Sequence, residues 1–344
     1  MKQFNVGIVG YGWAAGAHIA AINAGALGQV TAVCSSRKLD AAEVSAKHGC
    51  ALRTYNDYAA MLADPNIHAV SICTYHRFHK DQIIAAARAG KHIIAEKPLA
   101  QDLAGLREVE QAVRAAGVTL CVCLEMRFSE QFRTIKSLIN DGKLGKLHYG
   151  EVDYFHGIGP WYPGFKWYPT AEDGVSSFML AGCHAMDALL FCFDGEVDEV
   201  FAYSVTSANP VFKPYEYPST TIAMLKFRDG KIGKAASVLD CFQPYYFHTH
   251  LVGSEGTVLD DKFSGQDKQW TKLPFKPVDS GDVSDHPYKT EFDSFFEAIS
   301  RRKEMPLTGL ADAVRTHEVI FAADLSWQQK RPVKLKEIQQ KGSQ

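Results

Sequence analysis

The chain has 344 residues, of which 46% are hydrophobic and 22% are charged, and its formal net charge is −2. This composition is typical of a globular protein, and the length suits two domains better than a single hydrophobic core. A nucleic-acid or anionic-membrane partner is not expected, because binding of that kind needs a strongly basic surface.

The first third of the chain alternates between strand and helix patterns. Short apolar runs rich in β-branched residues lie at Val6–Val9, Val30–Cys34, Ala69–Cys73, His92–Ala95 and Val118–Leu124. Longer stretches with helical spacing lie between them, at Ala14–Ala24, Ala41–His48, Lys80–Ala89 and Leu103–Ala116. Strands separated by helices form βαβ units, so residues 1–125 are predicted to form an α/β domain with a doubly wound parallel sheet.

The pattern changes after about residue 125. Helices are predicted at Ser129–Asn140, Phe178–Phe193, Lys289–Ser300 and Ala311–Gln328. Strand-like runs occur at Leu147–Phe155, Val197–Ser207, Ser219–Phe227, Ile232–Leu239, His248–Val252 and Thr257–Asp260. Because the later runs have no helices between them, residues 126–344 are predicted to form a second domain of the α+β class with a large, mostly antiparallel sheet.

The eight cysteines are expected to be reduced thiols. The chain shows no signal-peptide pattern at its start, and no apolar run reaches the roughly 18 residues of a membrane span, so a cytoplasmic location is expected. Cys121 and Cys123 alternate along one strand and would face the same side. A metal pair is one interpretation, but buried apolar thiols are favoured without a second Cys or His pair at ligand spacing, and no metal is predicted.

A glycine turn follows the first strand. Gly10, Gly12 and Ala15 form the pattern G-x-G-x-x-A, and Trp13 opens the helix behind it. The first glycine permits a tight turn, the second lets the backbone approach a pyrophosphate, and the small Ala15 lets the helix pack on the sheet. Free N–H groups at the helix N-terminus would hold the anion. In this strand–turn–helix setting, the pattern predicts a Rossmann domain that binds a dinucleotide, with an ordinary glycine turn as the alternative.

The end of the second predicted strand bears on the choice of cofactor. An acid at this point would bind the ribose hydroxyls of NAD, but the strand ends in serines followed by two basic residues. The hydroxyls of Ser35 and Ser36 and the guanidinium of Arg37 can hold a 2′-phosphate through charge-assisted hydrogen bonds. The sequence therefore favours NADP slightly over NAD, unless Arg37 and Lys38 only form a solvated loop.

Further motifs carry a family resemblance. Glu96-Lys97-Pro98 follows the strand His92–Ala95, and Gly182-Cys183-His184-Ala185-Met186-Asp187 lies in the predicted helix of the second domain. Together with His18 behind the glycine turn, these segments resemble the Gfo/Idh/MocA oxidoreductases, named for glucose-fructose oxidoreductase, inositol dehydrogenase and a rhizopine-catabolism protein. The resemblance covers nearly the whole chain. It implies a Rossmann domain for the cofactor and a second domain for substrate binding and oligomer formation.

The resemblance also implies roles for individual residues. Lys97 and His184 would act in proton transfer, and the cofactor site would include Thr74, His79, Glu96 and Lys97 beside the glycine turn. Asp187 lies three positions after His184, near the same helix face, where it can orient the imidazole or cap a packing interaction, and it is counted among the predicted substrate-binding residues. The family often has an aspartate four residues before this histidine. Leu180 stands there in this chain, which leaves the proton path undefined.

Aromatic residues are the remaining substrate candidates. Tyr154, Trp161, Tyr162 and Trp167 are predicted to contact the substrate, because aromatic faces stack on sugar rings and tyrosine hydroxyls form hydrogen bonds. Simple packing of the aromatic stretch between Trp161 and Tyr168 is an equal alternative.

These features predict an enzyme that transfers a hydride between NAD(P) and a hydroxyl of a sugar, cyclitol or sugar derivative, with Lys97 and His184 in proton transfer. A redox-neutral glycosidase, which some family members are, is the alternative. A non-catalytic dinucleotide-binding regulator is a third possibility, but the presence of both Lys97 and His184 disfavours it. The family implies a small carbohydrate-like substrate and a homodimer or homotetramer.

Overall fold

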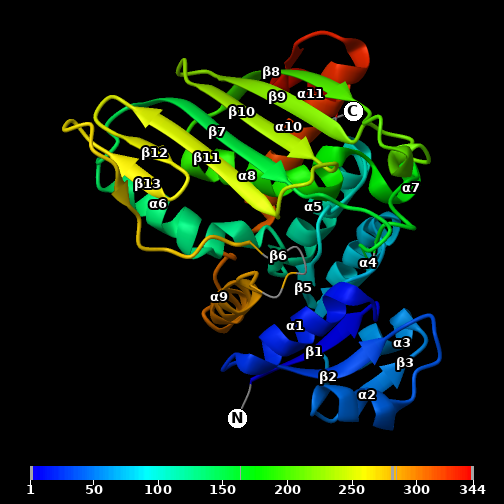
Figure 1. Ribbon diagram of the computed structural model, residues 1–344. Coiled ribbons are helices and arrows are strands. Elements are labelled where there is room, and N and C mark those ends of the chain that lie inside the picture. Colours follow the sequence, from blue (N-terminus) through cyan, green and yellow to red (C-terminus); the bar gives the residue numbers. More distant parts are fainter. Residues whose placement is uncertain (1–2, 163, 280–282, 284, 342–344) are drawn as a thin grey trace. The chain divides into compact units, whose positions relative to one another are not determined.

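The chain forms two compact units in a computed structural model that describes residues 3–162, 164–279, 283 and 285–341 (Figure 1). The first unit contains Met1–Glu125 and Pro287–Val314, and the second contains Met126–His286 and Arg315–Gln344. The units therefore differ from a simple division of the chain after residue 125, because a late segment belongs to the first unit.

The first unit contains a six-stranded parallel sheet with the order β3-β2-β1-β4-β5-β6. Its strands are β1 (Phe4–Val9), β2 (Gly28–Cys34), β3 (Arg53–Tyr55), β4 (Ala69–Ile72), β5 (His92–Ala95) and β6 (Leu120–Val122). The strand order reverses direction at β1 and β4, and a doubly wound sheet binds its ligand outside the carboxyl ends of the strands at such a point. The predicted parallel sheet is confirmed, and the short β3 was not predicted.

The helices of the first unit begin and end where the sequence provides caps. They are α1 (Trp13–Ala24), α2 (Ala41–His48), α3 (Tyr58–Ala63), α4 (His76–Arg88), α5 (Leu103–Ala116) and α9 (Tyr288–Ser300). The Asp102 side chain accepts a hydrogen bond at the start of α5, and Gly117 ends that helix in the left-handed conformation. Helix α9 comes from the late segment and packs against α1. Its Phe296 stacks on Phe4 at 5.8 Å between ring centroids.

The second unit contains a nine-stranded sheet with the order β14-β13-β12-β11-β7-β10-β9-β8-β15. Its strands are β7 (Leu147–Phe155), β8 (Val197–Val205), β9 (Thr220–Phe227), β10 (Ile232–Val238), β11 (Tyr246–Gly253), β12 (Thr257–Leu259), β13 (Lys262–Ser264), β14 (Thr271–Lys272) and β15 (Val333–Lys334). The pair β7 and β10 is parallel and the other described pairs are antiparallel. The predicted, mostly antiparallel sheet is therefore confirmed.

Helices cover one face of this sheet (Figure 1). The remaining helices of the chain are α6 (Glu130–Asn140), α7 (Ala171–Gly174), α8 (Cys183–Cys192), α10 (Leu310–Gln329) and α11 (Leu335–Lys341). The predicted helix Phe178–Phe193 is divided into a π-helical turn at Phe178–Gly182 and the α-helix α8. Residues Ala171–Cys192 are long and apolar enough for a membrane span, but 89% of the tested window is buried inside the protein, as in the core helix of a globular unit.

The other face of the sheet is open within this unit. Along β9, buried and exposed residues alternate strictly after Thr220, as expected for a strand with one face on a core. Large hydrophobic side chains that are 41–71% exposed share the open side of β8, β9 and β10; they are Tyr203, Val205, Ile222, Met224 and Ile232. We call these five residues the apolar stripe.

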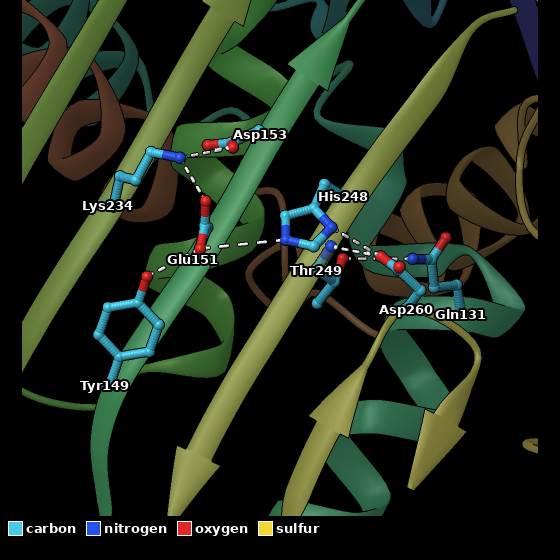
Figure 2. A network of polar contacts seen from close by, with 8 residues as sticks. All are labelled: Gln131, Tyr149, Glu151, Asp153, Lys234, His248, Thr249 and Asp260. Atoms are coloured by element: carbon cyan, nitrogen blue, oxygen red, sulfur yellow. Dashed lines mark hydrogen bonds and ion pairs between the residues drawn. The ribbon is translucent and has the colours of Figure 1, made fainter. Parts of the chain in front are cut away.

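A network of ion pairs lies on β7, β10 and β11 and reaches Asp260, between β12 and β13 (Figure 2). Its Lys234 shares β10 with Ile232 of the apolar stripe. The Lys234 ammonium donates to the carboxylates of Asp153, at 2.8 Å, and Glu151. Burial raises the pKa of Asp153, and His248 forms a 3.0 Å hydrogen bond with the carboxylate of Asp260. The open face thus carries both apolar side chains and acidic side chains that are paired with Lys234 or His248.

Candidate functional site

The two glycines of the glycine turn in the first unit, Gly10 and Gly12, are there for different structural reasons. Gly10 has a φ of 88°, and a Cβ atom built there would lie 2.7 Å from the carbonyl oxygen of Cys73. A Cβ atom at Gly12 would meet nothing within 4 Å. The fold itself therefore requires glycine only at position 10, whereas the small size of Gly12 matters for a molecule that approaches from outside. Ala15 is fully buried where α1 packs on the sheet, as predicted.

The N-terminus of α1 offers an anion site above this turn. Gly12 is the N-cap and provides no side-chain hydrogen bond, and the first turn contains no acidic residue. The first N–H groups of a helix have no partner within the helix, and the helix dipole adds positive potential there. This arrangement suits the pyrophosphate of a dinucleotide. Trp13 opens the helix and is 41% exposed.

Basic groups gather around the turn after β2. Ser35 is buried and its Oγ accepts a 3.2 Å hydrogen bond from the backbone N–H of Arg37. The exposed Arg37 guanidinium donates to the backbone carbonyl of Tyr11 inside the glycine turn, and Ser36 is also exposed. Lys47 lies 5.2 Å above the centre of the Tyr11 ring. A phosphate at this position would therefore face cationic side chains.

Glu96, at the end of β5, is held by two side chains of the same unit. Its Oε1 lies 3.0 Å from Nε2 of His18 and accepts a 3.1 Å hydrogen bond from the hydroxyl of Tyr288. His18 is fully buried, and its Nδ1 lies 2.8 Å from the hydroxyl oxygen of Ser71. Burial alone would lower the pKa of His18, but the Cys73 sulfur and the Glu96 carboxylate outweigh it and raise that pKa to about 10. The carboxylate that precedes Lys97 is thus fixed in orientation.

His79 and Thr74 shape the same sheet edge. The ring nitrogens of His79 lie 2.7 Å from the carbonyl oxygen of Pro98 and 3.0 Å from that of Thr74, and the residue is fully buried. Burial lowers the pKa of His79. The fully buried ring lies between these two carbonyls, so its geometry suits a role in positioning this segment next to Lys97, and the cofactor contact of His79 stays a prediction. Lys97 itself is half-buried, and the Thr74 hydroxyl donates to Gln82 at 2.6 Å.

In the second unit, close packing sets the position of His184. A Cβ atom at Gly182 would lie 2.4 Å from Cβ of Ser237 on β10, so only glycine lets the start of α8 approach the sheet this closely. The π-helical turn before α8 adds a local widening, a feature that often occurs at functional sites. Both features lie directly before His184, which is 5% exposed.

Histidines and tyrosines surround His184. The Tyr154 ring lies 6.0 Å from the His184 ring, and the His286 ring lies 6.5 Å from it. Tyr245 packs on Tyr154 at 5.2 Å, and its hydroxyl oxygen lies 3.2 Å from Nε2 of His286. His156 lies between Tyr154 and Tyr245, at 5.6 Å and 5.1 Å between centroids. We call these five residues the His–Tyr cluster.

The aromatic stretch contributes unequally to this region. Tyr162 lies 5.0 Å from the His156 ring, so it joins the cluster. Trp161 and Trp167 are 69% and 49% exposed. Pro163, which the same stretch includes, lies outside the described residues. The structure therefore brings Tyr154, Tyr162 and His184 together and leaves both tryptophans at the surface.

The comparisons with known proteins identify the chain. A family model described as "Oxidoreductase family, NAD-binding Rossmann fold" matches residues 4–124, and a "GFO/IDH/MocA C-terminal domain" model matches residues 132–259. The chain belongs to the Gfo/Idh/MocA oxidoreductase family. The resemblance inferred from Glu96-Lys97-Pro98 and the residues around His184 is confirmed.

Relatives and solved structures extend over most of the chain. A myo-inositol 2-dehydrogenase of Thermotoga maritima is 25% identical over 293 residues, which cover 83% of this chain and 85% of that protein. A 1,5-anhydro-D-fructose reductase of Ensifer adhaerens is 27% identical over 284 residues, 77% of this chain and 81% of that protein. The structure of a levoglucosan dehydrogenase in complex with NADH and levoglucosan superposes with a TM-score of 0.84 at 22% identity, over 97% of this chain and 100% of that chain. As a member of this family, the present chain is an oxidoreductase with an NAD-binding Rossmann fold.

Asp187, which was predicted to orient His184 or contact the substrate, lies in a buried ion pair. Its two carboxylate oxygens accept 2.7 Å hydrogen bonds from Nε and an Nη of Arg127, and the Thr316 hydroxyl donates to it at 2.7 Å. Arg127 and Asp187 are 4% and 1% exposed. A buried, bidentate ion pair of this kind supports a structural role in anchoring α8. Leu180, at the usual aspartate position of the family, is buried.

Sequence reasoning missed three members of the site. His156, Tyr245 and His286 were not predicted as site residues. A signal for His156 existed, because it follows Tyr154 by two positions and residues so spaced share one side of a strand. Tyr245 carries no local signal, since it reaches Tyr154 only through the pairing of β11 with β7. The ion pair between Arg127 and Asp187 could not be predicted either, because the two residues are 60 positions apart in the sequence.

Proposed function

We propose that the protein is an NAD(P)-dependent dehydrogenase or reductase that acts on a hydroxyl of a cyclitol, sugar or sugar derivative. The His–Tyr cluster is the observation that carries this proposal, because it sets three imidazoles and two phenols around the first turn of α8. Such groups offer both donors and acceptors for a polyhydroxylated ring, and aromatic faces for its C–H groups. The relatives named for inositol, anhydrofructose and levoglucosan support the same class of substrate.

In this proposal, separate residues of the chain bind the cofactor, support Lys97 and transfer the proton. The glycine turn and the N-terminus of α1 hold the pyrophosphate, and Glu96 supports the conformation of the segment that carries Lys97. The nicotinamide, when bound, accepts or supplies the hydride. Lys97 polarises the substrate oxygen and His184 takes or returns its proton, which is general acid–base catalysis by groups at the ends of two separate elements.

A substrate panel tests the proposal. Purified protein is incubated with NAD or NADP and a set of inositols, aldoses, anhydro sugars and sugar acids, and NAD(P)H absorbance is recorded. We expect sustained absorbance with at least one cyclitol or sugar, and His184→Asn should abolish it. A panel without turnover for any hydroxyl substrate, together with intact dinucleotide binding, would point to the regulator instead.

The same panel separates the glycosidase alternative. Aryl glycosides are added with catalytic NAD, and released phenol is measured beside NADH. A dehydrogenase releases no phenol, whereas a redox-neutral glycosidase releases phenol without net NADH formation. Phenol release that depends on His184 would overturn our assignment of net oxidoreduction.

We propose NADP as the preferred cofactor within this function. The support is the exposed Arg37 guanidinium at the glycine turn, with Ser35 and Ser36 beside it and no acid at the tip of β2. Arg37→Ala should weaken NADP binding by about tenfold or more and leave NAD binding nearly unchanged, because only the 2′-phosphate loses an ion pair. Equal losses for both dinucleotides in fluorescence titrations would refute the preference.

We also propose that the protein acts as a homo-oligomer in the cytoplasm. The apolar stripe supports the first part, because five large exposed side chains on one face of a sheet are typical of a surface that a second copy covers. The eight cysteines are free thiols, which suits a reducing compartment. Ile222→Glu should reduce the sedimentation coefficient, whereas the matched surface change Lys303→Glu should not. A monomer in the unmodified protein at micromolar concentration would refute the assembly.

A further inference from the structure

A second set of chemically active side chains lies inside the first unit, at the carboxyl ends of its strands. His18 comes from α1, Glu96 follows β5, and Cys123 follows β6. Nε2 of His18, a carboxylate oxygen of Glu96 and Sγ of Cys123 all lie within 4.8 Å of one another. The set thus presents one nitrogen, one oxygen and one sulfur to a common point.

The spacing of these atoms suits a small divalent cation. His18 Nε2 lies 3.0 Å from Glu96 Oε1 and 3.9 Å from Cys123 Sγ. A tetrahedral zinc ion, with ligand bonds of about 2.0–2.3 Å, needs its ligand atoms roughly 3.3–3.6 Å apart. Small side-chain rotations would therefore bring all three donors to bonding distance. The fourth position would be filled by a water molecule or by the hydroxyl of Tyr288, which already hydrogen-bonds Glu96.

The neighbours of the three donors act as supports. Ser71 lies 2.8 Å from Nδ1 of His18, so the ring is oriented with Nε2 toward Glu96 and Cys123. A partner on the other ring nitrogen is what zinc-bound histidines require. His18 and Cys123 are fully buried, whereas the Glu96 side chain is 13% exposed and provides the entry route.

We propose that His18, Glu96 and Cys123 form a site for one zinc-like divalent cation. Thiolate and imidazole donors select Zn²⁺ or Cd²⁺ over Mg²⁺ and Ca²⁺, which prefer oxygen. Because Cys73 and Glu96 raise the pKa of His18 and burial raises the pKa of Cys123, the cation has to displace the Nε2 proton and the thiol proton, so its binding releases protons to solvent and weakens as the pH falls. When the ion is bound, Glu96 becomes its ligand and gives up its present contact with His18. Because Glu96 directly precedes Lys97, this change would shift Lys97 away from its catalytic position. Bound metal is therefore inhibitory, a consequence that rests on the proposed function, whereas binding itself does not.

Cadmium binding provides the direct test. The full-length protein is titrated with Cd²⁺, and thiolate-to-metal charge-transfer absorption in the ultraviolet is recorded, with thermal unfolding measured in parallel. We expect a band that saturates near one equivalent and a raised Tm, because an ion that binds only the folded state stabilises it. Cys123→Ser should remove this band. The matched change Cys121→Ser should keep it, because that thiol lies within β6, contacts the Thr308 hydroxyl at 3.7 Å and is not one of the three converging donors.

Second variants keep the test decisive. If Cys123→Ser fails to fold, Ser71→Ala leaves all three donors in place and should raise the Kd for Cd²⁺ by about tenfold or more, since it removes the support of the histidine ring. A band that is absent, or that survives in Cys123→Ser, would overturn the site. Zn²⁺ should also lower kcat reversibly, with recovery in a chelator. Undiminished kcat with saturated metal would overturn the inhibitory role alone, and the binding data would show which part failed.

Discussion

Replacing Asp187 by asparagine separates a structural role for this residue from a role in substrate binding. The Arg127–Asp187 pair is bidentate and almost fully buried. The change keeps the size of the side chain but leaves the Arg127 guanidinium without its counter-charge. Removal of one partner from a buried pair costs about 3–5 kcal/mol, and asparagine retains one acceptor, so we expect a loss of about 3 kcal/mol.

The assay is urea unfolding followed by tryptophan fluorescence and circular dichroism. If the two units unfold separately, only the transition of the second unit should move, because Arg127, Asp187 and Thr316 all belong to it. The double variant Arg127→Met with Asp187→Leu should recover most of the loss, since apolar residues of similar volume often replace a buried ion pair without penalty. The Thr316 hydroxyl can then turn to a backbone carbonyl of its own helix.

Kinetics complete this prediction. Under conditions where Asp187→Asn remains folded, KM should stay within about threefold of the unmodified value, because the carboxylate faces Arg127 and Thr316. Unchanged stability combined with a much higher KM would refute the reasoning and return Asp187 to the substrate site.

Three further predictions follow from the sites. Gly12→Ala should leave Tm nearly unchanged and weaken dinucleotide binding, whereas Gly10→Ala should lower both, as dye-based melting and NADH titration will show; equal Tm values for the two variants would contradict the geometry. Lys97→Ala should keep dinucleotide binding but reduce kcat by about 10²-fold or more, and a near-normal kcat would remove Lys97 from the mechanism. Burial raises the pKa of Asp324 to about 6, against hydrogen bonds from Ser176 and Trp327 that lower it, so its contribution to stability is complete below about pH 3.8 and is lost as the pH rises through 6. Asp324→Asn should therefore match the unmodified protein at pH 4 and exceed it by up to about 3 kcal/mol at pH 8 in urea unfolding, and an equal difference at both pH values would contradict this.

Local pattern was sufficient for much of the fold. The runs at Val6–Val9 and Ala69–Cys73 are continuous and apolar, which is what a strand buried on both faces requires, and they form β1 and β4. Strand β3 contains only Arg53–Tyr55 and pairs along one edge, so it lacks a long pattern. The three-residue strands β12 and β13 extend the far edge of the second sheet, and β13 was not predicted for the same reason.

The candidate site was predicted where chemistry and local motif coincide. The spacing of Gly10 and Gly12 indicates their role, and the neighbouring residues in the sequence indicate the roles of Lys97 and His184. Tyr245 and His156 meet only because β11 pairs with β7 in one register. The pairing register depends on packing over the whole sheet, so a single sequence does not reveal it.

The return of Pro287–Val314 to the first unit has a consequence for synthesis on the ribosome. The six strands of the parallel sheet are complete once residue 122 has left the exit tunnel, but α9, which covers α1 and places Phe296 against Phe4 and Gly28, is made much later. Until then the nascent first unit exposes that apolar surface while the second unit's sheet is being translated. The native first unit therefore cannot finish folding in the order of synthesis, and an excised fragment that ends at residue 125 will aggregate unless α9 is supplied.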